Sequence, residues 1–384
     1  MSASETLSRV MPLLPDFGVT RVARHTGLDR IGIPVWCAYA PNAHSIVVAQ
    51  GKGLGDEDAK VSAVMEALER AVAARPCVDI ISGTAGTLQA TGHRVALLNS
   101  LIGLHKADIG LDEQIEWARA RELLSDTPVY VPIEAACLDQ TRDARFWMSS
   151  DGLASGNSIE EATLHGVLER IERDAHVLWQ IGRDMTRHSR CVDPRGYGDP
   201  AIDDLVAKID TAGLALRLFD ITSDIAIPCF TALLAPSNVL SDPDVRFVEV
   251  TGGSGAHPSP VRAAIRAVTE AIQSRLTYIS GARDDITPQT FQTPLPAQTR
   301  QAFAAIPLPP APSLSQEPLS LPLLLAHTLD RLRNVGIDLV AALPLSDPIL
   351  PFSVVKVFIP ALESPDGQRA RRYGSRAISK ALMS

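Results

Sequence analysis

Carboxylate and amide side chains recur along the chain as three equally spaced pairs, and their types suit the binding of a metal ion. The pairs are Glu66 with Glu69, Glu169 with Glu172, and Glu270 with Gln273. Their first members lie 103 and 101 residues apart, from 66 to 169 and from 169 to 270, and such a period indicates an internal repeat. Residues three apart share one face of a helix, and Mg²⁺ is typically bound by one or two carboxylates together with phosphate oxygens. The pattern therefore predicts a site for hard divalent cations.

Each pair lies on an amphipathic segment that follows a stretch containing glycine. We expect strands at 43–50, 144–150 and 245–250, glycine loops after them, and helices at 58–75, 158–179 and 259–279. Ser158 with Glu161 has the spacing of a capping box, and Ser259 before Pro260 is a helix N-cap pattern. A helix N-terminus behind a glycine loop suits an anion, and arginines on the same faces can clamp phosphates. Together these parts predict a nucleoside triphosphate held by magnesium ions.

The charged helix faces and Lys52 can each be interpreted in a second way. A charged face is also what any solvent-exposed amphipathic helix carries, and it is the repetition that favours a site. Lys52 follows the first expected strand, but the surrounding GKGLGDED lacks the GxxxxGK[ST] pattern of a Walker A loop. Lys52 is therefore either a phosphate-binding residue or part of a structural turn.

The composition indicates a folded protein without a membrane span. The 384 residues are 46% hydrophobic and 21% charged, with a net charge of −8, which disfavours disorder and general nucleic-acid binding. No apolar run approaches the roughly 18 residues of a membrane span, and the N-terminus lacks a signal-peptide pattern. The five cysteines form no CxxC pair, so we expect a reducing, cytoplasmic location. Length alone favours two or three domains, whereas the repeat favours a single α/β domain of strand–glycine loop–helix units around a central nucleotide cavity.

The three motifs and their flanks resemble those of the YcaO family. Ser62-xxx-Glu66-xx-Glu69-Arg70 resembles its SxxxExxER motif, Glu169-xx-Glu172-Arg173 its second ExxER motif, and Glu270-xx-Gln273-x-Arg275 its ExxQxR motif. The segments at 25–34 and 354–363 are similar to the family's N- and C-terminal parts. The resemblance covers about residues 20–365, which we interpret as one catalytic domain with a proline-rich loop at about 287–322. Residues 1–20 would form an N-terminal extension and 366–384 a basic, solvated C-terminal tail.

The resemblance implies an enzyme that binds ATP and Mg²⁺ and activates a backbone amide of a peptide. A nucleophile adds to the amide carbon, and the amide oxygen is phosphorylated and leaves as phosphate. Family members form azolines, thioamides or amidines in ribosomally made peptides. By motif matching, the implied magnesium ligands are Glu66, Glu69, Glu169 and Glu172. The implied nucleotide contacts are Ser62, Arg70, Asn157, Arg173, Gln273 and Arg275, with Glu270 serving as a nucleotide contact or as a metal ligand. No residue is singled out as the catalytic group.

Departures from the family pattern favour thioamide formation. Azoline-forming members commonly end in a PxPxP tail, whereas this chain ends in SRAISKALMS. Chains with a TGLDRIGIP-type opening resemble the members that act with a TfuA partner and insert sulfur. The segment before residue 20 is too short for a leader-peptide recognition domain, so we expect a partner protein to bring the peptide. The alternatives are azoline cyclodehydration and a non-catalytic ATP-binding adaptor that presents a peptide to another enzyme. Nucleic acid and membranes are not expected as partners, and a homodimer is left open.

Overall fold

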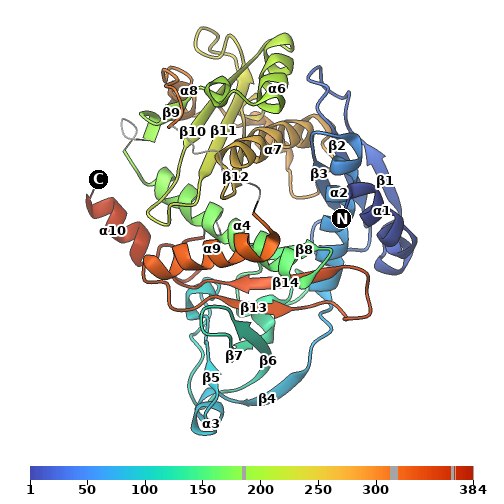
Figure 1. Cartoon of the computed structure of the whole chain (residues 1–384), viewed down its shortest axis with the longest axis vertical. Coiled ribbons are helices and arrows are strands. Elements are labelled where there is room, and N and C mark those ends of the chain that lie inside the picture. Colours follow the sequence, from blue (N-terminus) through green and yellow to red (C-terminus); the bar gives the residue numbers. More distant parts are fainter. Residues whose placement is uncertain (184–186, 312–318, 365–366, 368, 384) are drawn as a thin grey trace.

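The computed structural model describes residues 1–183, 187–311, 319–364, 367 and 369–383. Its described strands form three sheets that surround three long helices (Figure 1). These helices are α2 (Asp56–Ala74), α4 (Ile159–Gln180) and α7 (Pro260–Ser280). They agree with the helices expected at 58–75, 158–179 and 259–279, and the α/β fold class is confirmed.

Each sheet has an edge strand that leads into one of these helices. The small antiparallel sheet has the order β1 (Arg21–Arg24), β2 (Val35–Tyr39), β3 (Val48–Lys52). The four-stranded sheet has the order β12 (Thr251–Ala256), β11 (Cys229–Pro236), β10 (Leu214–Asp220), β9 (Cys191–Val192). The largest sheet has the order β5 (Arg94–Val95), β7 (Thr127–Pro132), β6 (Gln114–Glu122), β13 (Ala341–Pro344), β14 (Ser353–Phe358), β8 (Leu153–Gly156), and β4 (Ile80–Thr84) also pairs with β6. The helices that follow the edge strands β3, β8 and β12 meet in the middle of the molecule (Figure 1).

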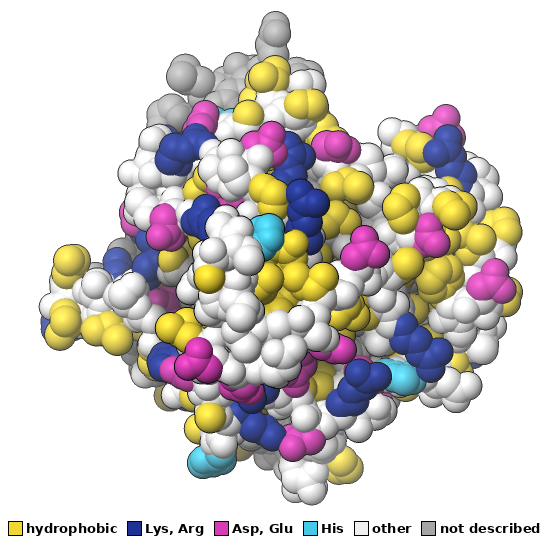
Figure 2. Space-filling model, turned by 90° about the horizontal axis from the view of Figure 1, so that it is seen from below, with side chains coloured by type: hydrophobic (Ala, Val, Ile, Leu, Met, Phe, Trp, Pro, Cys, Tyr) yellow, Lys and Arg dark blue, Asp and Glu magenta, His cyan; other side chains and the backbone are white. Residues whose placement is uncertain are grey.

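Shorter helices pack on the sheets and on the long helices. They are α1 (Ala3–Val10), α3 (Ala85–Ala90), α6 (Pro200–Thr211), α8 (Ala297–Ala302), α9 (Leu321–Asn334) and α10 (Ser375–Met383). Of these, α1 packs on α2, and α9 and α10 pack on α4. Within the described residues, no helix is both long and apolar enough to cross a membrane. Acidic and basic side chains are interspersed over the lower face of the molecule (Figure 2).

Two of the three strands lie later in the chain than expected. Residues 144–150 contain an isolated bridge at Phe146 but no strand. The 3₁₀-helix Phe247–Glu249 occupies the middle of 245–250. The glycine-bearing stretches that we expected to be loops are themselves the strands β8 and β12.

Close packing of helix on strand explains why these strands contain glycine. A Cβ atom at Gly253 of β12 would overlap the backbone of Ala267 and Ala271 in α7. In the same way, a Cβ at Gly51 of β3 would overlap the backbone of α2. Glycine is thus required by the neighbouring helix backbone, and the low strand propensity of glycine misled the sequence-based assignment.

The helix N-termini form largely as expected. Ser259 caps α7 by accepting a hydrogen bond from the Arg262 N–H at 3.5 Å. Ser158 caps α4 by accepting from the Glu161 N–H at 3.2 Å. The Glu161 carboxylate, however, accepts from the Asn157 N–H at 3.0 Å instead of from Ser158, so only half of the expected capping box forms.

Each of the three long helices packs its apolar face on a hydrophobic core of its own. Helix α2 contributes Val64 and Leu68 to a core with β6 and β7. Helix α4 contributes Leu168 and Ile171 to a core with β14, and α7 packs Ile272 and other residues against β10, β11 and α6. Because the apolar faces are buried against the sheets, the polar faces of all three helices are left to face one another.

The C-terminal segment is attached to the body of the protein in part: Arg369 is buried and Arg376 half-buried, whereas Arg371, Arg372 and Lys380 are exposed as expected for a basic, solvated tail. Arg376 of α10 donates to both carboxylate oxygens of Asp174 in α4 at 2.9 Å, and it also pairs with Asp224. Arg371 donates to Asp108 at 2.6 Å. Asp174 is fully buried, so Arg376 neutralises a buried carboxylate of the domain, whereas the pair of Arg371 with Asp108 lies at the surface.

The N-terminal and proline-rich segments also contribute to the folded structure. Helix α1 packs on α2, and the Thr6 hydroxyl donates to the Asn157 side-chain oxygen at 2.7 Å. The region at 287–322 contains a 3₁₀-helix (Pro288–Gln292), α8, and a bridge between Val192 and Leu308. The end of its proline tract, from 312 to 318, lies outside the described residues.

Candidate functional site: an acidic cavity between three repeats

The polar faces of α2, α4 and α7 line one cavity of about 920 Å³. Its carboxylates are Asp58, Glu66, Glu69, Asp151, Glu161, Glu169, Glu172 and Glu270. Its cationic side chains are Lys52, Arg70, Arg173, Arg266 and Arg283. Eight carboxylates against five cationic groups leave an excess of negative charge, which favours a divalent cation as a ligand.

The first glutamate of each repeat accepts a hydrogen bond from a backbone N–H at the strand before its helix. The three contacts, at 3.2, 3.2 and 3.4 Å, are Gln50 N–H to Glu66, Gly152 N–H to Glu169 and Ser254 N–H to Glu270. The three carboxylates are therefore held in a similar way, although Gly152 lies one residue before β8 whereas Gln50 and Ser254 lie within β3 and β12. The three repeats that are visible in the sequence thus place equivalent glutamates in similar surroundings in the structure.

The second member of each pair contacts the strand of the next repeat. The contacts, all at 3.1 Å, are Ser155 hydroxyl to Glu69, Ala256 N–H to Glu172, and Gln273 side-chain amide to the Gln50 carbonyl. The first repeat thus contacts the second, the second contacts the third, and the third contacts the first. This closed cycle fixes the three helices around the cavity.

Arginines one turn after the first glutamates orient two of these carboxylates. Nε and Nη2 of Arg70 donate to Glu66 Oε1 at 3.1 and 2.9 Å. Nη2 of Arg173 donates to Glu169 Oε1 at 3.3 Å. Both guanidinium groups line the cavity, so they also stand where phosphates of a nucleotide could be clamped.

Lys52 takes the corresponding place in the third repeat. Its ammonium donates to Glu270 Oε2 at 2.6 Å, although Lys52 comes from β3 of the first repeat. Lys52, for which the sequence left a turn role open, therefore belongs to the site. The ion pair connects residues 218 positions apart and adds to the cycle of contacts.

Burial and mutual repulsion favour the protonated form of several of these carboxyl groups. Burial raises the pKa of Glu69 well above its ordinary value, and the neighbouring Glu66 and Glu169 add to the shift. Burial followed by the charge of Glu270 raises the pKa of Glu172 to about 7. Burial also acts on Glu270, but there Lys52 and Arg173 outweigh it, and the pKa is lowered. A bound cation would relieve this repulsion.

These raised pKa values predict that the stability of the free protein falls as the pH rises. They also predict that the stabilisation by bound magnesium increases as the pH rises. A carboxyl whose folded-state pKa lies above 4.5 stabilises the fold below pH 4.5 and loses that contribution as the pH rises through the folded-state pKa. For Glu172 this contribution is lost as the pH rises from about 4.5 through about 7. Mg²⁺ needs the ionised form. We therefore expect the rise in melting temperature caused by magnesium with an ATP analogue to be larger at pH 8 than at pH 5.5 in calorimetry.

Glu172→Gln serves as the control for this pH dependence. The substitution removes the titrating group while keeping the shape of the side chain, so the difference between the two pH values should shrink. An equal magnesium effect at pH 5.5 and pH 8 in the native protein would contradict the account.

The donor set fits magnesium bound jointly by protein and phosphate. In the described part of the chain, no three His, Cys, Asp or Glu side chains converge as a preformed metal site. The carboxylates instead stand in pairs across the cavity, and Mg²⁺ in nucleotide sites is bound by one or two carboxylates plus phosphate oxygens. Glu69 and Glu172, whose pKa values are raised, are the groups with most to gain from a cation.

Ten of the eleven residues implied by motif matching line the cavity. They are Ser62, Glu66, Glu69, Arg70, Asn157, Glu169, Glu172, Arg173, Glu270 and Gln273. Arg275 is not among the lining residues, and its Nε lies 3.7 Å from Asp29 Oδ2. Residues two apart on a helix differ by about 200° in direction. Arg275 therefore cannot share the face of Gln273.

Several residues that line the cavity are not among the site residues predicted from the sequence. Arg266 lies one turn before Glu270. Helical periodicity places the two residues on the same face, so the sequence could have predicted that Arg266 lines the cavity. Gln50, Asp151 and Arg283 come from a strand or from irregular segments. For those residues no spacing rule indicates that they reach the cavity.

Comparison with known proteins agrees with the resemblance to the YcaO family. Residues 50–363 match the family described as YcaO cyclodehydratase, ATP- and Mg²⁺-binding. A relative in Rhizobium leguminosarum bv. trifolii, called an uncharacterized protein in the tfuA 3′ region, is 37% identical over 99% of this chain and 92% of its own length. An uncharacterized protein of Methanothermobacter thermautotrophicus is 36% identical over 73% of this chain and 72% of its own.

Solved structures share the fold. YcaO from Methanopyrus kandleri, bound with AMPPCP and Mg²⁺, has a TM-score of 0.72 at 22% identity and covers 94% of this chain and 91% of its own. A heterocyclase in complex with substrate and cofactor has a TM-score of 0.76 at 20% identity. The match covers 95% of this chain and 52% of the heterocyclase, so this chain spans about half of that protein.

The fold and the cavity define an α/β protein with an acidic cavity between three structural repeats. The family match extends over most of the chain, and the chain belongs to the YcaO family. The family is one of ATP- and Mg²⁺-binding cyclodehydratases. The expectation of ATP and Mg²⁺ as cofactors is thereby confirmed.

Proposed function

We propose that this protein uses ATP and Mg²⁺ to convert a backbone amide of a ribosomally made peptide or protein into a thioamide, together with a TfuA-type partner. Sulfide adds to the amide carbon, the amide oxygen takes the γ-phosphoryl group, and the oxygen leaves as phosphate. The balance is peptide amide, hydrogen sulfide and ATP giving thioamide, ADP and phosphate. Bound ATP with Mg²⁺ supplies the phosphoryl group that makes the amide oxygen a leaving group.

The observation that carries this proposal is the closed cycle of three repeats around one acidic cavity. Glu66, Glu69, Glu169 and Glu172 would hold magnesium, and Arg70 and Arg173 would orient the first glutamates and clamp phosphates. Ser62, Asn157 and Gln273 line the same cavity and would contact the nucleotide, as would Glu270 with Lys52. Phosphoryl transfer depends mainly on positioning and charge stabilisation, and these are what the cavity offers.

Thioamide formation is favoured by the relative in the tfuA 3′ region, which matches this chain over nearly its full length. A partner encoded beside this protein would bring the peptide and a sulfur source. Azoline cyclodehydration is the second candidate, because the family is described as cyclodehydratases and heterocyclases share the fold. In that case a Cys, Ser or Thr side chain of the peptide is the nucleophile, and no sulfide is consumed.

Mass spectrometry of the peptide encoded beside this protein separates these reactions. With ATP, Mg²⁺, the adjacent partner and sulfide, we expect the peptide to gain the mass difference between sulfur and oxygen, with one ADP formed per exchange. Loss of one water without sulfide would show azoline formation instead. If no ATP is consumed with the peptide and its partner, the protein is an adaptor and the proposal is wrong.

A further inference from the structure

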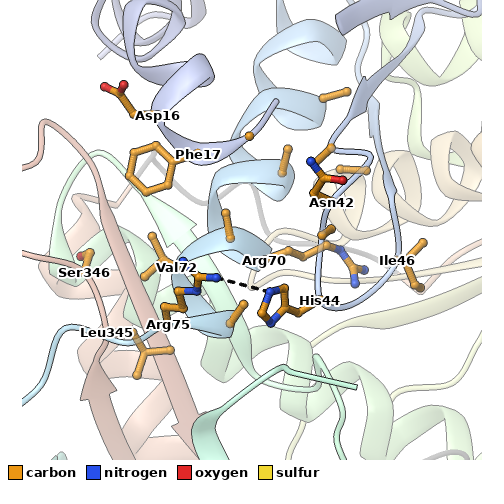
Figure 3. Close-up of a pocket in the computed structure, with 18 of the residues that line it drawn as sticks. Asp16, Phe17, Asn42, His44, Ile46, Arg70, Val72, Arg75, Leu345 and Ser346 are labelled. Carbon is orange, nitrogen blue, oxygen red and sulfur yellow. Dashed lines mark hydrogen bonds between the residues drawn. The ribbon is translucent and has the colours of Figure 1, made fainter. Parts of the chain in front are cut away.

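A second cavity, of about 600 Å³, lies against the C-terminal half of α2. Its walls are built mainly from small and apolar side chains, with alanines from β2, β3 and α2. Phe17 and Leu345, both labelled in Figure 3, and Leu350 also line it. The alanines leave the space that larger side chains would fill. Cavities of this size and lining commonly bind organic ligands.

A guanidinium group is held at the mouth of this pocket. The buried carboxylate of Asp139 lies 3.1 Å from His44 Nδ1, and the other ring nitrogen of His44 is 3.5 Å from Arg75 Nη2. Arg75 and His44 point toward one another beside the apolar wall (Figure 3). Within the described residues, no carboxylate lies within ion-pair distance of Arg75. Asp139 is paired with Arg142 as well as with His44, and the exposed guanidinium of Arg75 presents a positive charge at the edge of the pocket.

Two carboxylates also line the pocket. The Asp347 side chain accepts a hydrogen bond from the Ile349 N–H at 2.9 Å, within its own loop. Asp16 lies at the opposite end, next to Phe17, and is exposed (Figure 3). The pocket therefore carries acidic as well as basic groups, and the Asp347 carboxylate is already bound within its own loop.

The pocket adjoins the acidic cavity. Arg70 and Ile46 line both spaces, and the guanidinium of Arg70 is bound to Glu66 on the acidic side. A chain that passes Arg70 could therefore place one residue in each space.

We propose that this pocket is a specificity subsite that takes a bulky apolar side chain of the peptide substrate, with a carboxylate one residue away bound by Arg75. The peptide as occupant rests on the proposed function. The apolar side chain would replace water against the alanine wall, and the carboxylate would pair with the guanidinium. Sequences with glycine in place of the apolar residue, or glutamine in place of the acidic one, would be poorer ligands.

Binding of short peptides tests this subsite without any turnover. The probes are N-acetyl-Leu-Glu-amide, its Leu-Gln analogue and its Gly-Glu analogue, measured by saturation-transfer NMR on the full chain. We expect the Leu-Glu probe to bind best. Ala71→Phe and Ala74→Leu, which fill the pocket from two positions on α2, should each weaken it about tenfold, as for loss of one buried aliphatic side chain. Arg75→Gln should make the Leu-Glu and Leu-Gln probes bind equally.

Matched controls and an independent readout complete the test. Ala207→Phe on α6 and Arg119→Gln on β6 introduce the same kinds of change at exposed positions outside the pocket, and they should bind the probe as the native protein does. The exposed Cys77 lines the pocket, so the probe should slow its alkylation by iodoacetamide.

The outcomes separate this proposal from the proposed function. Binding of a magnesium–ATP analogue by the pocket variants shows that they fold. Equal probe binding by the native protein, Ala71→Phe and Ala74→Leu would overturn the subsite, as would absence of probe binding to the native protein. A failure to form thioamide in the separate turnover assay would overturn the proposed function and leave a positive binding result standing.

Discussion

The double substitution Glu66→Gln with Glu169→Gln is expected to weaken binding of a magnesium–ATP analogue by about 100-fold or more. Each glutamine keeps the shape of the side chain and an oxygen that can accept the strand N–H, but it removes the charge that a cation needs. Two charge-assisted contacts at about 1.5–3 kcal/mol each give this factor. Isothermal titration calorimetry with Mg²⁺ and a non-hydrolysable ATP analogue measures it.

Exposed glutamates on the same helices provide the control. Glu57→Gln on α2 with Glu160→Gln on α4 makes the same chemical change outside the cavity. This variant should bind the analogue as tightly as the native protein does. If the cavity variant also binds normally, Glu66 and Glu169 do not hold the metal, and their assignment as magnesium ligands is wrong.

Gly253→Ala is expected to lower the free energy of unfolding by about 3 kcal/mol, the upper part of the range for overpacked cores. The added methyl group would overlap the backbone of Ala267 and Ala271 in α7. Backbone cannot rotate away as a side chain can, so α7 must move off β12. That movement also displaces Glu270 from its contact with the Ser254 N–H. Chemical denaturation followed by circular dichroism measures the change.

The neighbouring glycine provides a matched control for this substitution. A Cβ atom at Gly252 would lie 3.5 Å from Leu233 Cδ2 and 3.6 Å from the Ala232 carbonyl oxygen, which are ordinary contact distances. Gly252→Ala should therefore change stability by less than about 0.5 kcal/mol. Similar losses for the two variants would mean that close packing of helix on strand is not the reason for the glycines.

The parts of the site that repeat along the chain could be predicted from the sequence. Helical periodicity placed Glu66 with Glu69 and Glu169 with Glu172 on polar faces, and equal spacing indicated that the three helices play equivalent roles. All four of these residues line the cavity. The caps at Ser158 and Ser259 were also readable, because capping depends on residues only three positions away.

The parts that depend on distant contacts could not be predicted. The strands β8 and β12 contain glycines that have low strand propensity, and they are stabilised by the helices packed on them. The pairing of Lys52 with Glu270 joins segments 218 residues apart. In the same way, Arg376 of the C-terminal segment has a buried partner, Asp174, that no local pattern indicates.

The central claim is that the amide oxygen of the peptide leaves as phosphate, and an isotope label tests it directly. The peptide encoded beside this protein is prepared with ¹⁸O in its backbone amides and incubated with the protein, the adjacent partner, ATP, Mg²⁺ and sulfide. We predict that the inorganic phosphate released carries one ¹⁸O for each amide converted. Phosphate that contains only oxygen from ATP and water, while the peptide is modified, would contradict the account.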